Sequence, residues 1–481
     1  MFFNSLHYAF FFLVVLALTT RLCRRVSSRN TLLLVASYYF YACWDWRFLG
    51  LIVVSTIVDY SCGRWLDSGE SSDHSPSRTR RHRWILLASI VTNLGLLGFF
   101  KYYDFFVTSA AELMEHLGLP FSTSTLNIIL PVGISFYTFQ TLSYTIDVFR
   151  GRIPAERNLL NFALFVAFFP QLVAGPIERA SRLLPQIREQ SKIDWTRFYS
   201  GFYLICWGLF KKVVIADQIA SVADAAFRAD QTSVPEVMVA VYAFAIQIYC
   251  DFSGYTDIAR GSARCLGFDL MLNFNLPYFS TNPSDFWRRW HISLSTWLRD
   301  YLYIPLGGNR KGSRRTYINL MLTMVLGGLW HGAAWTYVLW GLYQGILLCI
   351  HRLISPWLGN RPDQPKGGVG YWLRVACFFQ LICFGWLLFR AGSVGQVWRM
   401  MNVFLFNFNL TPRTLKLDDM LVFLSCTALF FGVQLIQWYK NDLKFVLRLP
   451  FLLRTAVYTA GILAFIFFGS KGGQAFIYFQ F

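Results

Sequence analysis

Long apolar stretches, each close to the length of a membrane crossing, recur along the whole chain and are separated by short polar segments. A helix needs about 20 mostly apolar residues to span the hydrocarbon core of a bilayer. The pattern predicts an all-α polytopic membrane protein with about eleven or twelve crossings, folded as one integrated domain over residues 1–481. The candidate crossings are residues 8–21, 31–45, 48–61, 84–103, 127–148, 199–218, 236–252, 317–330, 334–350, 373–390, 418–438 and 452–469.

Basic residues concentrate in short segments between the apolar runs, which the positive-inside rule places in the cytoplasm. Both termini are then expected outside. The apolar stretch 158–174 is flanked by basic segments on both sides, so a simple crossing would put one of them on the wrong side. We expect a re-entrant or tilted helix there. The basic segments are residues 21–30, 63–83, 150–198, 309–315, 351–374 and 439–454.

Composition supports the membrane class, with 55% hydrophobic and only 15% charged residues. The net charge of +18 comes from these short basic segments rather than from a folded basic domain, so nucleic acid is not the expected partner. The ten cysteines form no CxxC pair and lie mostly in apolar segments, which indicates buried free thiols. The first apolar run lacks a basic segment before it and a convincing cleavage site, so we expect a retained helix.

One histidine stands inside an apolar segment, in Leu329-Trp330-His331-Gly332-Ala333-Ala334-Trp335. An ionisable side chain at membrane depth is costly and is usually kept for function. Histidine is also the side chain best suited to proton transfer near neutral pH. Glycines on both sides of His331 permit a broken helix or a close approach of backbones, which at membrane depth is tolerated only around a cavity.

Two further polar segments precede it. Residues 247–257 end an apolar helix with Asp251 and Asp257, either a helix end at the interface or a pair that orients a histidine or arginine. In residues 282–301 the aromatic residues recur near helical spacing, which predicts an interfacial helix with aromatic anchors at the cytoplasmic face. His291 lies on this helix and by itself is more typical of an interfacial histidine than of a catalyst.

Other catalytic patterns are missing from the sequence. The glycine-rich segment 306–313 lacks the lysine of a phosphate loop and is expected to be a turn. The chain has no G-x-S-x-G elbow and no HExxH or comparable ligand set, so neither a serine acyl-enzyme nor a metal is expected. A histidine base that acts on a bound hydroxyl, with an acyl group already activated, is the chemistry left.

Several longer motifs in the chain are typical of one membrane protein family. The chain resembles the membrane-bound O-acyltransferases, and within them the bacterial branch that acetylates alginate or peptidoglycan or transfers D-alanine to teichoic acid. The resemblance covers nearly the whole length. It rests on Pro131–Tyr137, Phe169–Arg179, Lys211–Asp217, Asp251–Tyr255, Phe286–Tyr301 and the Leu-Trp-His-Gly element at His331.

The resemblance implies a fold and a site. The fold would be a ring of tilted helices, with re-entrant helices, around a thin centre where a cavity from each side meets near the histidine. His331 would be the catalytic histidine and His291 the second catalytic residue. The donor would be an acyl thioester, acetyl-coenzyme A or an acyl carrier protein, used as a substrate with no cofactor bound. The residues expected to contact substrate are Trp330, Trp335, Asp251, Arg288, Arg289, Trp287 and Trp290.

The aromatic C-terminus, Phe476–Phe481, has two interpretations. It is either an interfacial anchor or, as in similar tails of this branch, a segment in which Tyr478 accepts the acyl group. The second interpretation implies an extracytoplasmic esterase-like acetyltransferase as partner, with a polysaccharide synthase complex as a further one.

The expected function is therefore acetyl transfer across a bacterial inner membrane toward a polysaccharide such as alginate, peptidoglycan or cellulose. D-alanyl transfer to an envelope polymer is the alternative within the family. A transporter or flippase of an envelope precursor, or a scaffold for a synthase, are the alternatives of other classes. The absence of internal repeats weighs against the transporter, and His331 weighs against the scaffold.

Overall fold

Helices form the regular structure of the protein, and no strand occurs among the residues described by the computed structural model. These residues are 1–22, 25–67, 76–119, 125–126, 128–173, 175–190, 194–229, 232–357, 367–412, 415–469 and 476–477. They divide into two units, Met1–Ile205 with Ile258–Met271, and Cys206–Asp257 with Leu272–Phe481. The all-α prediction is confirmed, and the single domain stays a prediction.

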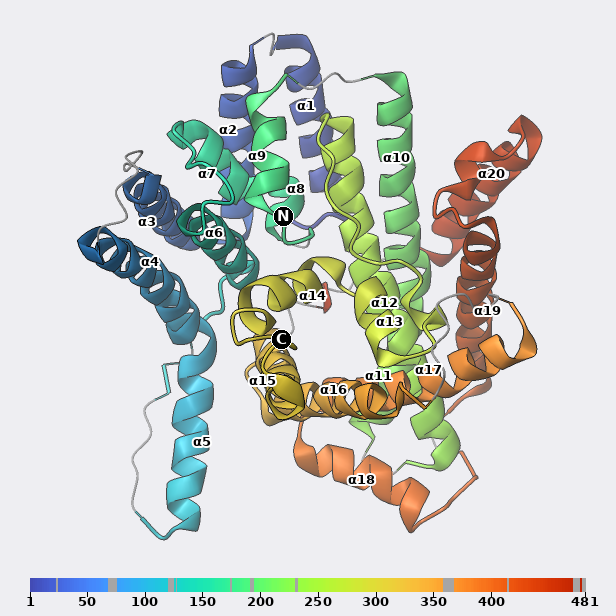
Figure 1. Ribbon diagram of the computed structural model, residues 1–481. Helices are drawn as coiled ribbons and strands as arrows, with labels where there is room; N and C mark the ends of the chain where they lie inside the picture. Colours follow the sequence, from blue (N-terminus) through green and yellow to red (C-terminus); the bar gives the residue numbers. More distant parts are fainter. Residues whose placement is uncertain are drawn as a thin grey trace. The chain divides into compact units, whose positions relative to one another are not determined.

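The first unit holds the N-terminal helices, drawn from blue to green in Figure 1. Its elements are α1 (Leu6–Leu22), α2 (Val26–Asp45), η1 (Trp46–Phe48), α3 (Leu49–Asp67), α4 (Pro76–Leu97), η2 (Gly98–Tyr102), α5 (Tyr103–His116), α6 (Ile134–Phe149), α7 (Leu159–Ala167), α8 (Phe169–Leu172), α9 (Ala180–Arg188) and most of α10 (Trp195–Leu209).

The second unit holds the C-terminal half, and the unit boundaries fall inside α10 and α12. Its elements are η3 (Phe210–Ala216), α11 (Asp217–Arg228), α12 (Val234–Cys265), η4 (Pro277–Phe279), α13 (Pro283–Arg289), α14 (Ile292–Leu298), η5 (Arg299–Tyr303), α15 (Gly312–His331), α16 (Trp335–Ile354), α17 (Val369–Arg390), α18 (Val394–Leu405), α19 (Leu417–Lys440), η6 (Phe445–Arg448) and α20 (Phe451–Phe468).

Eight helices among the described residues are long and apolar enough to cross a membrane. One of them, Val26–Asp67, contains two of the predicted crossings. The most deeply buried is Val234–Cys265, with 83% of its apolar window inside the protein, whereas Phe451–Phe468 has none. The helices agree with the expected polytopic membrane protein.

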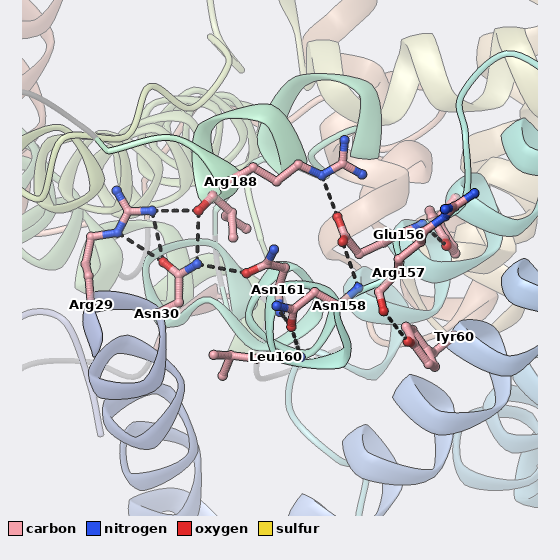
Figure 2. A network of polar contacts seen from close by, with 11 residues as sticks. Arg29, Asn30, Tyr60, Glu156, Arg157, Asn158, Leu160, Asn161 and Arg188 are labelled. Atoms are coloured by element: carbon pink, nitrogen blue, oxygen red, sulfur yellow. Dashed lines mark hydrogen bonds and ion pairs between the residues drawn. The ribbon is translucent and has the colours of Figure 1, made fainter. Parts of the chain in front are cut away.

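The stretch expected to be re-entrant folds as two short helices, α7 and α8, which break at Phe168. With nine and four residues, neither is long enough to cross a bilayer. A polar network ties α7 and α9 to α2 (Figure 2): Asn30 Nδ2 donates to Asn161 Oδ1 over 2.9 Å and to the carbonyl of Ile187 over 3.0 Å. The short helices are thus held inside the first unit.

Arg29 belongs to this network and corrects one expectation. The sequence pattern places Arg29 in a basic loop at the cytoplasmic surface, but it lies inside α2 and is only 5% exposed. Its guanidinium donates to Asn30 Oδ1 over 2.9 Å and to the carbonyl of Ile187 over 2.7 Å (Figure 2). A buried charge needs such acceptors, so Arg29 fastens α9 rather than facing solvent.

Small residues allow the two helices that flank the His331 motif to pack closely. Helices α15 and α16 lie side by side (Figure 1). A Cβ placed on Gly328 would lie 2.3 Å from the carbonyl oxygen of Tyr337 and 3.0 Å from the Cα of Gly341. Both clashes involve backbone, which cannot move aside cheaply, so glycine is required at this crossing.

We therefore expect Gly328→Ala to lower the free energy of unfolding by about 1–3 kcal/mol, as overpacking does. Gly432→Ala in α19 is the matched control, because a Cβ there meets nothing within 4 Å. That control should be neutral or stabilising by up to about 1 kcal/mol, since alanine is the better helix former. Thermal unfolding of both variants in detergent measures the difference, and equal effects would contradict the packing argument.

Candidate active site

His331 is the last residue of α15, and the chain turns at Gly332 before α16 begins at Trp335. A Cβ on Gly332 would lie 2.1 Å from the ring of Tyr337, so the turn also depends on a glycine. The two interpretations of the glycines beside His331 hold on different sides of it: close backbone approach before it and a break after it. Helix α15 continues through Gly327 and Gly328, whose role is helix packing, and only the side after His331 is broken.

Aromatic rings enclose His331, which is 3% exposed. The ring centroids of Trp330 and Trp340 each lie 5.1 Å from that of His331, and Phe389 lies at 5.4 Å. The enclosure is formed by the end of α15 together with residues of α16 and α17. Such a surrounding excludes water from the imidazole.

His291 corrects the expectation of one interfacial helix over residues 282–301. The chain forms α13, breaks at Trp290 and His291, and continues in α14 and the π-helical η5. Helix α13 begins at Pro283, and Asn282 is its N-cap. The aromatic side chains are not surface anchors, because Phe286, Trp290 and Trp297 are buried in the protein.

The break gives His291 a strained backbone, with φ of +42°, in the left-handed region that few side chains adopt. Two backbone hydrogen bonds hold the chain on both sides of this break: Asn275 N donates to Arg289 O, and Ile292 N donates to Asn273 O, both over 2.9 Å. Ser293 Oγ also donates to Asn273 Oδ1 over 2.9 Å. Backbone strain that is held this firmly is typical of functional sites.

The two histidines, 40 residues apart in the sequence, meet in the structure with ring centroids 6.2 Å apart. His291 is fully buried, 4.8 Å from the ring of Phe252 and 5.9 Å from that of Trp330. The structure thus brings the two histidines together, while their catalytic roles stay a prediction. Sequence reasoning missed the rings of Phe252, Trp340 and Phe389, because an aromatic residue on an apolar helix does not reveal which face it occupies.

His291 lies outside the eight candidate spans, and burial lowers the pKa of its imidazole to about 3. The ring is therefore neutral at physiological pH. Below about pH 6.5 the imidazole of His291 binds a proton in the unfolded chain but stays neutral in the folded protein. Because of this difference, we expect the free energy of unfolding to be highest above pH 6.5 and to decrease as the pH falls toward 3. Unfolding of His291→Gln against pH should show a shallower loss, and a slope equal to that of the wild type would contradict it.

The tryptophans expected to bind substrate divide into two groups. Trp330 is buried beside both histidines, Trp287 lies 5.9 Å from Trp340, and Trp290 lies 4.8 Å from Trp386. Trp335 is different, since it is 53% exposed at the first turn of α16. The structure brings the first three toward the enclosure and leaves Trp335 at the surface.

The arginines of α13 also differ from each other. Arg289 forms an ion pair with Asp285 one turn earlier, at 2.9 Å. Arg288 is exposed. Arg288 is thus the arginine of this pair that is better placed to meet a charged group from outside.

Asp251 and Asp257 lie inside α12, which continues to Cys265, so the helix end expected within residues 247–257 is wrong. Each of the two carboxylates pairs with a lysine. Asp251 Oδ1 lies 2.6 Å from the ammonium of Lys212, and Asp257 Oδ2 lies 2.7 Å from that of Lys211. The lysines belong to the π-helical segment η3, a form of helix often found at functional sites. The pair of Asp251 and Lys212 is buried, and that of Asp257 and Lys211 is partly buried.

Tyr478 lies outside the described residues. The two residues before it, Phe476 and Ile477, are described and are 0% and 3% exposed. Within the described part of the chain, no group of three or more His, Cys, Asp or Glu side chains is placed to hold a metal ion.

Comparison with known proteins identifies the family of the chain. The model of MBOAT, the membrane-bound O-acyltransferase family, matches residues 12–389. A protein of Azotobacter vinelandii named "Probable alginate O-acetylase AlgI" is 44% identical over 77% of this chain and 72% of its own length. A peptidoglycan O-acetyltransferase of Helicobacter pylori is 36% identical over the same shares. A teichoic acid D-alanyltransferase of Bacillus subtilis is 28% identical over 55% of this chain and 69% of its own length. The chain belongs to the membrane-bound O-acyltransferase family and is a multi-pass membrane acyltransferase.

Proposed function

We propose that the protein passes acetyl groups from a cytoplasmic thioester across the bacterial inner membrane for O-acetylation of an extracytoplasmic polysaccharide. The observation that carries the proposal is the enclosure of His331 and His291, 6.2 Å apart, by aromatic rings. Relatives named for the O-acetylation of alginate and peptidoglycan support acetyl as the group and a polysaccharide as the final acceptor. The D-alanyltransferase is less similar, so D-alanyl transfer is the weaker alternative.

In this reaction His331 is the general base. Its imidazole takes the proton of an acceptor hydroxyl while the hydroxyl oxygen attacks the carbonyl carbon of the thioester. The resulting tetrahedral intermediate collapses when the C–S bond breaks. The acetyl group stays on the acceptor oxygen as an ester, and the thiolate leaves and recovers the proton from the imidazolium.

His291 is the second catalytic residue of the proposal. A neutral imidazole carries one N–H, and a donor of this kind stabilises the negative oxygen of the intermediate. Burial keeps the pKa of His291 low enough for the neutral form to dominate. The rings of Phe252, Trp330 and Trp340 keep water away, which protects the thioester from hydrolysis.

The donor is a substrate, and no bound cofactor enters the proposal. Acetyl-coenzyme A and an acyl carrier protein both carry phosphate on a long arm. The exposed side chain of Arg288 suits such a phosphate. Trp287 and Arg289 flank it in the same short helix, and Trp290 is the C-cap of that helix. Trp335 is exposed at the start of α16, so in this proposal it contacts the part of the substrate that lies outside the enclosure.

Tyr478 is the proposed first acceptor on the way to the polysaccharide. Phe476, two residues earlier, lies 5.8 Å from Phe252, and Phe252 lies 4.8 Å from His291. These ring contacts link Phe476 to His291 through Phe252, which an anchor at the membrane interface would not need. An acetylated phenol ester would then pass its group to an extracytoplasmic esterase-like acetyltransferase, within or beside a polysaccharide synthase complex.

Isotope-labelled acetyl thioester supplied to the inside of membrane vesicles tests the function. An acyltransferase places the label on an ester that depends on His331, whereas a flippase moves an intact precursor and forms no ester. A scaffold would give the same labelling with and without His331. Parallel assays with acetyl-coenzyme A, an acetylated carrier protein and a D-alanyl thioester identify the donor.

A further inference from the structure

The last described residues of the chain return to the protein core after an exposed helix. Helix α20, Phe451–Phe468, has no buried residue, but Phe476 is 0% and Ile477 is 3% exposed. We call these two residues the C-terminal segment. Ordering a chain end costs conformational entropy, so a buried end needs specific contacts to hold it.

One side of α12 supplies these contacts. The backbone N–H of Ile477 donates to Asp251 Oδ2 over 2.7 Å. The ring of Phe476 stacks on Tyr255 with centroids 4.2 Å apart and an interplanar angle of 27°. Asp251 and Tyr255 are one helical turn apart, so they present a single face to the C-terminal segment.

The charge arrangement explains why Asp251 takes a backbone donor. One ammonium, that of Lys212, lies 2.6 Å from Asp251 Oδ1 and 2.8 Å from Asp217 Oδ1. All three side chains are at most 3% exposed. Two buried carboxylates share one lysine, so a further donor stabilises the remaining oxygen of Asp251. A hydrogen bond to a charged acceptor is also stronger than one between neutral groups.

We propose that Asp251, fixed by Lys212, is the binding site for the C-terminal segment of the chain itself and thereby positions that segment near His291. Asp251 is then a positioning residue rather than one that contacts substrate. The contacts are those of Ile477 with Asp251, of Phe476 with Phe252, and of Phe252 with His291. The binding stands by itself, and only its benefit to acyl transfer rests on the proposed function.

Hydrogen–deuterium exchange of the C-terminal peptide in the purified full-length protein tests the binding directly. Asp251→Ala should speed the exchange roughly ten- to hundredfold, which corresponds to one lost hydrogen bond to a charged group. Asp224→Ala is the matched control. Asp224 is also an aspartate of the second unit that forms an ion pair, with Arg390 at 2.6 Å, and it makes no described contact with the C-terminal segment. Exchange in the control should stay at the wild-type rate.

A second variant distinguishes the loss of this contact from a general unfolding of the Asp251→Ala protein. Ile477→Pro removes the donated N–H, replaces the side chain and fixes φ, and it leaves the pair of Asp251 and Lys212 intact. It should speed exchange of the neighbouring amides, and combining it with Asp251→Ala should add little, because both remove the same bond. Wild-type exchange in Asp251→Ala, or additive effects in the double variant, would overturn the proposal.

Activity assays separate this proposal from the acyl-carrier role of Tyr478. If Tyr478→Phe transfers acetyl normally while Asp251→Ala still releases the tail, the binding site stands and the carrier role is wrong. If the tail carries the acyl group, Asp251→Ala lowers the turnover number and leaves the KM for the thioester unchanged. Ile477→Pro should then show the same pattern of kinetic constants.

Discussion

Replacing His331 with alanine is expected to abolish acetyl transfer, lowering the rate at least about a hundredfold, because general-base catalysis contributes that much or more. His331 is 3% exposed inside aromatic rings, and the only other imidazole within this enclosure in the described residues is that of His291. The measurement is esterified label per unit of membrane-inserted protein. Expression and detergent-solubilised unfolding are recorded in parallel.

His331→Gln is the companion variant, because it nearly fills the space of the imidazole and avoids a cavity. Both variants should insert and both should be inactive. His116→Gln, at the exposed end of α5, controls for the loss of a histidine as such and should retain activity. Undiminished acetylation in His331→Ala would refute the general-base role.

The second large effect is expected at Tyr478. Tyr478→Phe removes one oxygen and keeps the aromatic ring, so an interfacial anchor would tolerate the change. If the phenol accepts the acetyl group, the variant should lose transfer to the polysaccharide as completely as His331→Ala does. The readout is labelled glycan, together with an intact-mass search for an acetylated C-terminal peptide in the wild type.

The control for this variant uses the same tail. Phe481→Tyr adds a phenol to the last residue of the chain without removing Tyr478, and should leave transfer unchanged. Normal glycan labelling in Tyr478→Phe, with no acetylated peptide in the wild type, would leave the anchor as the correct interpretation of the tail.

The sequence predicted the helices better than their breaks. Hydrophobic stretches follow from the thickness of the bilayer, so the all-α, multi-pass fold can be read from the chain. The segment 282–301 shows the limit. Its aromatic residues have helical spacing, but His291 adopts a left-handed conformation and divides the helix, because contacts with Asn273 and Asn275 hold it there.

The same limit applies to charged residues. Arg29 was expected at the surface and is buried. Asp251 was expected either at a helix end at the interface or beside a histidine or arginine, and it pairs with Lys212 inside a helix. Which partner a charge finds depends on residues distant in the sequence. A local pattern shows that a charge exists but carries no information on what lies opposite.

The sequence by itself determined the class of protein, the family motifs and the two histidines, because bilayer thickness and the chemistry of proton transfer restrict residue types position by position. Only the tertiary structure decided that His291 and His331 meet and that the C-terminal segment binds Asp251. Such contacts join residues 40 or more than 200 positions apart. They arise from the packing of whole helices, and no short stretch of sequence specifies them.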